Sequence, residues 1–273
     1  MTPSIVVLTD FFAVSNRALS YAAGLAVPLK ASLLLLHARH DELLAPAAFA
    51  SRHTTDGELK TAYALEKLAA AQPVATDIDI SSFSLAEALQ EVVGQRPPLL
   101  VVLGRAGAEP TPEDLVTATA MDLLRHTPYP LLVIPLAGWD AFPPRRLLLA
   151  VDGEPFSLVE YRDVLNQLLH ATQGTFSLVQ VTDNGDTPPS AAAVLDTVRT
   201  NDLVSELAEN SLRQVYQNTI VGGILQEAAG EQADMLVVVA RRHSLLGGLF
   251  HRSVTAQLLR ESAIPVLVLP AAD

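Results

Sequence analysis

The 273-residue chain contains no cysteine. Without thiols it can form no disulfide framework, no cysteine-ligated zinc site and no thiol nucleophile. Basic residues are also scarce, because 18 Lys and Arg stand against 30 Asp and Glu, for a formal net charge of -12. This acidic balance argues against general binding to nucleic acid, which needs a basic surface.

Long apolar runs are missing as well. The longest runs, such as Leu33 to Leu36 and Leu99 to Leu103, fall far short of the ~18 apolar residues that cross a membrane. The N-terminus has neither the basic segment nor the cleavage site of a signal peptide. We therefore expect a cytoplasmic protein with no membrane partner. The apolar share of 49% is enough for a sizeable core.

Two parts of the chain repeat each other. Ile5-Val-Val-Leu-Thr-Asp10 is similar to Leu147-Leu-Leu-Ala-Val-Asp152, and Pro130-Leu-Leu-Val-Ile-Pro135 is similar to Pro265-Val-Leu-Val-Leu-Pro270. Between the copies, Gly138 and Pro143-Pro144 break the apolar pattern. The sequence therefore predicts two domains, at residues 1–137 and 144–273.

Short runs rich in Val, Leu and Ile predict five strands in each copy. Most are continuous rather than alternating, as is typical of parallel strands that are buried on both faces. Helical patterns separate them, so we expect two doubly wound α/β domains, each with a five-stranded parallel sheet. The expected strands are 4–9, 32–38, 74–80, 98–104 and 130–135, then 146–151, 176–182, 213–218, 234–240 and 265–269.

Local signals predict where several helices begin and end. Ser84-Leu-Ala-Glu87 and Ser157-Leu-Val-Glu160 have the spacing of a capping box, in which a hydroxyl and a carboxylate satisfy opposite backbone N–H groups. Gly94 suits the residue just after a helix. Thr111-Pro-Glu-Asp114 indicates a helix start, with Thr111 as the cap.

A ligand of such a sheet binds beyond the carboxyl ends of its strands, where the strand order reverses. Asp10 and Asp152 end the first strand of each copy, and Gly104 and Val239 lie at the end of the fourth. If those strands are neighbours, each aspartate faces the loop after the fourth strand. The two carboxylates can contact a ligand or cap local backbone groups. No residue is nominated as a nucleophile, general base or metal ligand, and His37, inside an apolar strand, is interpreted as a core histidine.

Both copies resemble the universal stress protein (UspA) family in a tandem arrangement. The resemblance is carried by Thr9-Asp10-Phe11 with a Ser15-capped helix, by Leu124-Arg-His-Thr-Pro-Tyr-Pro-Leu-Leu-Val-Ile134, and by Ser253-Val-Thr-Ala-Gln-Leu-Leu-Arg260 with Ile264-Pro-Val-Leu-Val268. It implies an adenine nucleotide alpha hydrolase-like fold. It also implies that the copies pack as an internal pseudo-dimer through their last strands, which are apolar and need covering. A homodimer of the whole chain stays open.

ATP-binding members of that family carry Gly-x-x-Gly-x9-Gly-[Ser/Thr] after the fourth strand, and their aspartate contacts the base or ribose side. The first copy keeps Gly104 and Gly107 but has Thr117-Ala118 where the last glycine and hydroxyl belong. The two glycines therefore fit a simple turn or a retained nucleotide contact. Glu109, Glu113 and Asp114 would repel a triphosphate.

The second copy loses all three glycines and keeps Ser253. Ungapped spacing puts Val239, Arg242 and Arg252 at the glycine positions, whereas a one-residue deletion puts Ala240 and His243 at the first two. Arg241, Arg242 and Arg252 can form an anion site next to the helix that begins at Ser253. They can equally lie in a solvated loop and pair with nearby acids.

The resemblance implies a non-catalytic binding or regulatory module of the stress response with degenerate ATP-binding motifs. The alternative is a nucleotide-binding hydrolase of the same α/β class, and a pure protein-binding scaffold is a third reading. No cofactor is assigned, and ATP, another nucleotide or a small anion stay open as ligands. A shared fold alone is a weak argument for function.

Overall fold

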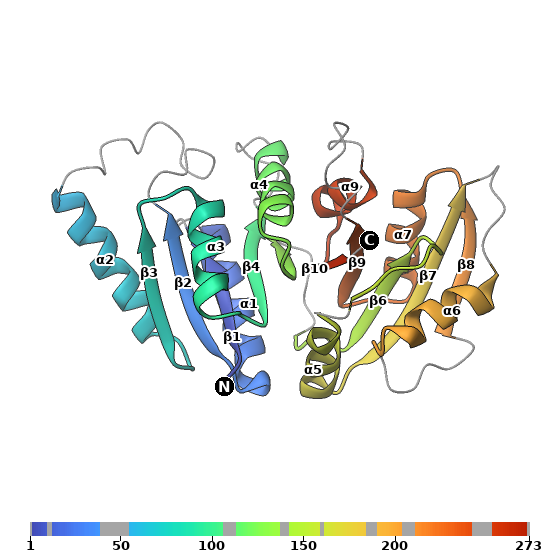
Figure 1. Cartoon of the computed structure of the whole chain (residues 1–273), viewed down its shortest axis with the longest axis horizontal. Coiled ribbons are helices and arrows are strands. Elements are labelled where there is room, and N and C mark those ends of the chain that lie inside the picture. Colours follow the sequence, from blue (N-terminus) through green and yellow to red (C-terminus); the bar gives the residue numbers. More distant parts are fainter. Residues whose placement is uncertain are drawn as a thin grey trace. The chain divides into compact units, whose positions relative to one another are not determined.

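The computed structural model describes residues 2–9, 13–38, 55–105, 113–136, 142–158, 161–183, 190–203, 211–241 and 253–271. The chain divides into two compact units, Met1–Leu136 and Ala137–Asp273. Each unit is an α/β structure in which strands and helices alternate (Figure 1).

The first unit contains a five-stranded parallel sheet in the order β3-β2-β1-β4-β5. The chain moves outward from β1 to β3 and then returns to β4 and β5, so right-handed crossovers place the early and late helices on opposite faces. In agreement, α3 and α4 contact each other, while α1 contacts β1 and β4. The elements are β1 Ser4–Leu8, α1 Ala13–Leu29, β2 Ser32–Ala38, α2 Thr55–Ala70, β3 Thr76–Ser81, α3 Leu85–Gln95, β4 Leu100–Arg105, α4 Glu113–His126 and β5 Leu131–Pro135.

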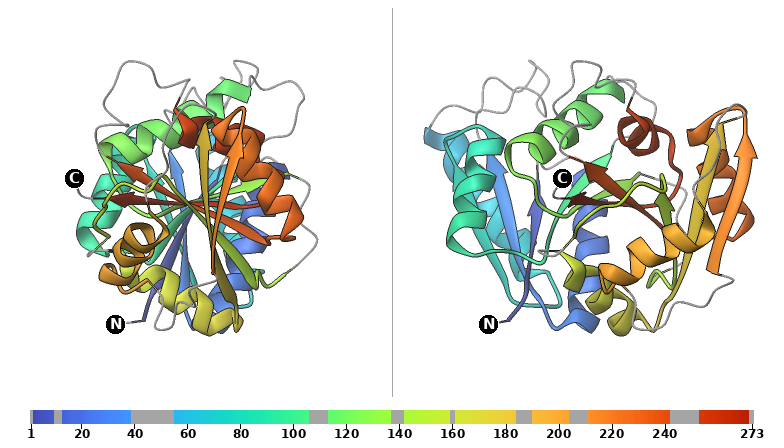
Figure 2. Two further views of the ribbon diagram at one scale, coloured as in Figure 1. Left: turned by 90° about the vertical axis from the view of Figure 1, so that its right-hand side faces the viewer. Right: turned by 45° about the vertical axis from the view of Figure 1, so that its right-hand side comes forward.

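The second unit repeats this plan with the order β10-β9-β6-β7-β8, again parallel throughout. Helices α6 and α7 lie on opposite sides of β8 (Figure 2). The elements are β6 Arg146–Val151, α5 Arg162–Thr172, β7 Thr175–Asp183, α6 Ala191–Thr200, β8 Leu212–Gln217, α7 Ile220–Gly230, β9 Met235–Arg241, α9 Val254–Glu261 and β10 Val266–Ala271.

The ten expected strands are confirmed, with ends that move by at most two residues. Their apolar runs form the centre of each core: Ile5, Val6 and Val7 are fully buried, as are Leu148 and Leu149. Continuous burial is the reason for the unbroken apolar pattern, because helices cover both faces of a parallel sheet. The outer strand β8 is only partly buried and alternates weakly.

In the first unit, the Ser84 cap is confirmed in full, and the helix signals at Gly94 and Ser15 are wrong. Ser84 caps α3, since its Oγ accepts the N–H of Glu87 and the Glu87 carboxylate accepts the N–H of Ser84 at 3.1 Å. Gly94 does not follow the helix but lies inside α3, which ends at Gln95. Similarly, Ser15 lies in the first turn of α1, which begins at Ala13, and is therefore not its cap.

The second capping box is also wrong. Helix α5 begins at Arg162, after Tyr161, and not after Ser157. The buried N–H of Leu158 donates to Oδ1 of Asn201 at 2.6 Å, a tertiary contact that ties this segment to the end of α6. Glu160, the other half of the expected box, lies outside the described residues. Thr111 and its following proline lie outside the described residues, and α4 begins at Glu113.

Candidate functional site

Each unit has the strand order that creates a crevice at the carboxyl edge of its sheet. β1 lies between β2 and β4, and β6 lies between β7 and β9, so both first strands are neighbours of the fourth strand. The chain leaves the two neighbouring strands toward opposite faces, and a ligand of an open α/β sheet binds at this point. Asp152 directly follows β6 at this point. Asp10 lies outside the described residues.

Strand register decides how the fourth strands correspond. Val7 is opposite Val102 in the first unit, and Leu149 is opposite Val237 in the second. Counting onward along the strands from these pairs aligns Gly104 with Val239, as the ungapped spacing has it, and not with Ala240. Gly107, Arg242 and Arg252, the other positions of the motif, lie outside the described residues.

Arg241 and Asp152 form a two-pronged ion pair at the second crevice. Nε of Arg241 donates to Oδ2 of Asp152 at 3.1 Å, and Nη2 donates to Oδ1 at 2.8 Å. The two residues are 89 positions apart in the chain but meet because β6 and β9 are neighbours. The Arg241 side chain is only 10% exposed, whereas that of Asp152 is 58% exposed. Paired N–H donors that match both carboxylate oxygens make the strongest class of arginine contact.

The same guanidinium also holds the loop that follows β6. Nη2 donates to the carbonyl of Glu154 at 2.8 Å, and Nη1 donates to the carbonyl of Pro155. The ring of Phe156 lies 6.0 Å from the guanidinium carbon. Gly153 has φ of 88°, a left-handed conformation that strongly favours glycine, and it lets the chain turn around the arginine.

Asp152 thus satisfies local backbone as well as the arginine. Its Oδ1 accepts the N–H of Glu154 at 3.0 Å, which is the local capping role that the sequence left open. A buried glutamine, Gln180, also binds the backbone of Asp152. Gln180 is 1% exposed, and its Nε2 donates to the Asp152 carbonyl. Its Oε1 accepts a hydrogen bond from Nε2 of Gln214 at 2.7 Å. Sequence reasoning missed both glutamines. The available signal was Gln180 between the buried apolar residues Val179 and Val181 of β7.

The helix after this crevice begins as expected. Ser253 is the N-cap of α9, and its Oγ accepts the N–H of Ala256 at 3.1 Å. Arg242 and Arg252, the other members of the expected cluster, lie outside the described residues. Of the three arginines, the structure describes Arg241. Its charge is paired with Asp152, as in the interpretation that these arginines pair with nearby acids.

The first crevice is described only in part. Gly104 lies in the buried end of β4, opposite Ile134 of β5. Gly107 and Glu109 lie outside the described residues, as do the side chains of Glu113 and Asp114. Nδ1 of His37 donates to the carbonyl of Thr9 at 2.9 Å, so the imidazole secures the end of β1.

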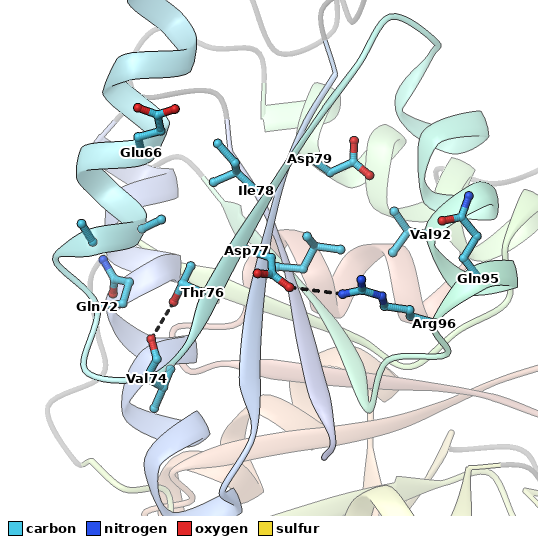
Figure 3. A pocket seen from close by; sticks show the side chains of 13 residues that line it. Glu66, Gln72, Val74, Thr76, Asp77, Ile78, Asp79, Val92, Gln95 and Arg96 are labelled. Atoms are coloured by element: carbon cyan, nitrogen blue, oxygen red, sulfur yellow. Dashed lines mark hydrogen bonds and ion pairs between the residues drawn. The ribbon is translucent and has the colours of Figure 1, made fainter. Parts of the chain in front are cut away.

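A separate open groove of about 820 Å³ lies along β3, between α2 and α3 (Figure 3). Its charged lining includes Asp77, which forms a solvent-exposed ion pair with Arg96 at 3.2 Å. The groove follows the amino-terminal half of β3 and so lies away from the carboxyl edge where α/β sheets bind ligands. No sequence motif pointed to it.

Two carboxyl groups in the described part of the chain have clearly shifted pKa values, and neither is at a crevice. Burial raises the pKa of Asp234, but hydrogen bonds from the side chain of Arg146 and from two backbone N–H groups outweigh it, so the net pKa is lowered. Hydrogen bonds from Ser84 lower the pKa of Glu87. Lowered values suit structural carboxylates rather than general acids.

The described residues contain no cluster of three or more His, Cys, Asp or Glu side chains that could hold a metal ion. Within the same residues, no helix is long and apolar enough to span a membrane.

Two units, each with a parallel sheet whose first strand lies between its second and fourth, define a tandem doubly wound α/β protein. Residues 1–135 and 144–270 each match the model of the universal stress protein family, so the chain belongs to that family. No curated protein matches the chain in sequence.

Solved structures share the fold across the whole chain. A universal stress protein from Archaeoglobus fulgidus is 14% identical, with a TM-score of 0.69 and 98% of each chain covered. A putative universal stress protein from Pseudomonas aeruginosa is 16% identical, with a TM-score of 0.58, 99% of this chain covered and 94% of the other. The cytoplasmic domain of a prokaryotic cation chloride cotransporter is 10% identical, with a TM-score of 0.54, and covers 100% of this chain and 96% of its own. These likenesses concern the fold alone.

Proposed function

We propose that this protein is a non-catalytic binding or regulatory module of the stress response and acts in the cytoplasm. The observation that carries the proposal is the match of the universal stress protein family to both halves of the chain. The absence of a transmembrane helix from the described residues is compatible with it.

The site favours binding over hydrolysis. Hydrolysis of a nucleotide needs positioned phosphates and groups that stabilise the charge developing on them. The second half replaces all three glycines of the phosphate loop, and its Asp152 is held by Arg241. The first half lacks the third glycine and its hydroxyl. A ligand is therefore expected to bind without being turned over.

Ligand contacts are proposed separately for each half. In the first, Asp10, Gly104 and Gly107 would contact a ligand that need not carry a triphosphate. In the second, Arg242, Arg252 and the helix start at Ser253 would bind a small anion, such as phosphate, because positive charge gathers beside a helix N-terminus. Arg241 is excluded from this anion set since its charge already pairs with Asp152.

We also propose that the domains, 1–137 and 144–273, form an internal pseudo-dimer through β5 and β10. Each is the outer strand of its own unit and is wholly apolar apart from proline, and such an edge needs covering. Hydrogen exchange tests this arrangement in the intact chain. Amides of β5 and β10 should exchange as slowly as those of the central β1 and β6. Exchange as fast as that of the opposite outer strands, β3 and β8, would argue for separated domains.

The functional proposal is tested on gently purified protein. Mass spectrometry of the released small molecules identifies a bound nucleotide, another anion or no ligand, and a steady-state assay measures ATP turnover. We expect no turnover above that of buffer. Turnover that is lost in Asp10→Asn would instead support the hydrolase.

A further inference from the structure

The burial of Arg241 is unusual for a charged side chain at the rim of a sheet. A guanidinium that is withdrawn from water needs partners for its charge and for its N–H groups. Here the partners are the Asp152 carboxylate and the carbonyls of Glu154 and Pro155. All three come from one short loop, so the loop wraps around the arginine.

The loop that holds Arg241 lies at the expected ligand position of the second unit. Asp152 is the acid at the carboxyl end of β6, beside β9, where a ligand of a doubly wound sheet would sit. Both of its carboxylate oxygens accept hydrogen bonds from Arg241. A pair of donors from a ligand could take this same edge of the carboxylate, across both oxygens, only after displacing the guanidinium.

We propose that Arg241 is an internal occupant of the second crevice and closes it to nucleotides. The chemistry that this crevice recognises is a guanidinium group: a planar cation whose N–H donors match one carboxylate and two neighbouring carbonyls. Counting along the chain from the paired strands, the residue of the first half that corresponds to Arg241 is Ala106, whose side chain has no donor; it lies outside the described residues. The two halves therefore differ in sequence at corresponding positions.

This inference goes beyond the proposed function and does not depend on it. The contact would hold in a chain that binds no ligand in its first half, and it leaves an anion site at Arg242 and Arg252 unaffected. Failure of the one would not imply failure of the other.

The first experiment is chemical rescue of the full-length Arg241→Ala variant. Methylguanidinium should bind beside the freed Asp152 and raise the unfolding midpoint by about 3 °C or more at roughly ten times its dissociation constant, relative to sodium at equal ionic strength. The matched control is Arg213→Ala, which removes an arginine of β8 from an ion pair with Glu227. Wild type, the control and Asp152→Asn/Arg241→Ala should show no such gain. Absence of the gain in Arg241→Ala, or an equal gain in the double variant, would overturn the proposal.

The second experiment uses the wild-type chain and so does not depend on a variant that folds. Amide signals of Gly153 and Glu154 are followed by NMR while AMP or ATP is added. We expect these signals to stay in place, even if signals near Gly104 move. A nucleotide-dependent shift at Gly153 and Glu154 would show that the crevice is open, and the proposal would be wrong.

Discussion

Asp234 offers the sharpest test of how the second unit is held together. This carboxylate lies just before β9, and its side chain is 6% exposed. Oδ2 accepts the backbone N–H groups of Arg145 and Arg146, each at 2.9 Å, and Oδ1 accepts Nη2 of Arg146 at 2.9 Å. One side chain therefore joins the start of β6 to the start of β9.

We predict that Asp234→Ala lowers the free energy of unfolding of the second unit by about 2–4 kcal/mol, because two partly buried N–H groups each lose a charged acceptor worth roughly 1–3 kcal/mol. The ion pair itself adds little, since Arg146 is 45% exposed and exposed pairs contribute at most about 1 kcal/mol. Asp234→Asn keeps one acceptor oxygen and should cost less.

The matched control is Asp77→Ala, which also removes an aspartate from an arginine pair but at side chains that are 70% and 73% exposed. Its expected cost is below ~1 kcal/mol. The assay is hydrogen exchange under denaturant, read on β6 and β9 for one variant and on β3 for the other. Equal losses in the two variants would refute the reasoning, because burial would then not matter.

The pH dependence of Asp234 has a definite sign. Its pKa is lowered in the folded protein, so the carboxylate stabilises the fold above its unfolded pKa of about 3.9. That contribution is lost as the pH falls through the folded pKa. The stability difference between wild type and Asp234→Asn should therefore be constant near neutral pH and shrink in acid. A difference that grows in acid would contradict this assignment.

Three further predictions concern other sites. Ser84→Ala should destabilise α3 by about 1 kcal/mol through loss of its cap, and amide exchange in α3 should rise while exchange in α9 does not. Asn201→Ala should cost roughly 2–3 kcal/mol, because Asn201 bonds to the backbone of Leu158, Phe156 and Thr197; exchange at residues 156–158 measures it, and Asn166→Ala, which removes a single exposed bond to Asp202, is the control. Calorimetry with ATP·Mg should detect no binding of ATP phosphates at the first half. A micromolar affinity that disappears in Gly107→Arg would contradict this.

Features that depend on neighbours in the chain could be predicted from the sequence. The strands follow from apolar runs whose residues are buried on both faces, so composition alone marks Leu147 to Leu149 as a central strand. The cap of α3 needs only Ser84 and Glu87, three positions apart, and both of its bonds are present. Repetition of these local patterns was enough to predict two α/β units.

Signals with the same local form failed elsewhere. Ser157 has the capping-box spacing, yet α5 begins at Arg162, and the N–H of Leu158 bonds to Asn201, 43 positions away. Gly94 can end a helix but does not have to, and α3 continues through it to Gln95. In both cases the tertiary contacts or the helix pattern outweighed a weak local preference.

The amino-acid sequence by itself determined the two-fold repeat, the parallel sheets and the acid that follows each first strand, because these depend on periodicity and spacing. It also placed Arg241 near a crevice, but left open whether that arginine meets a ligand or an acid. Only the tertiary structure decided this, since Arg241 and Asp152 are 89 residues apart and come together through the pairing of β6 with β9. A buried charge takes the partner that the fold brings within hydrogen-bonding distance, and spacing along the chain does not contain that distance.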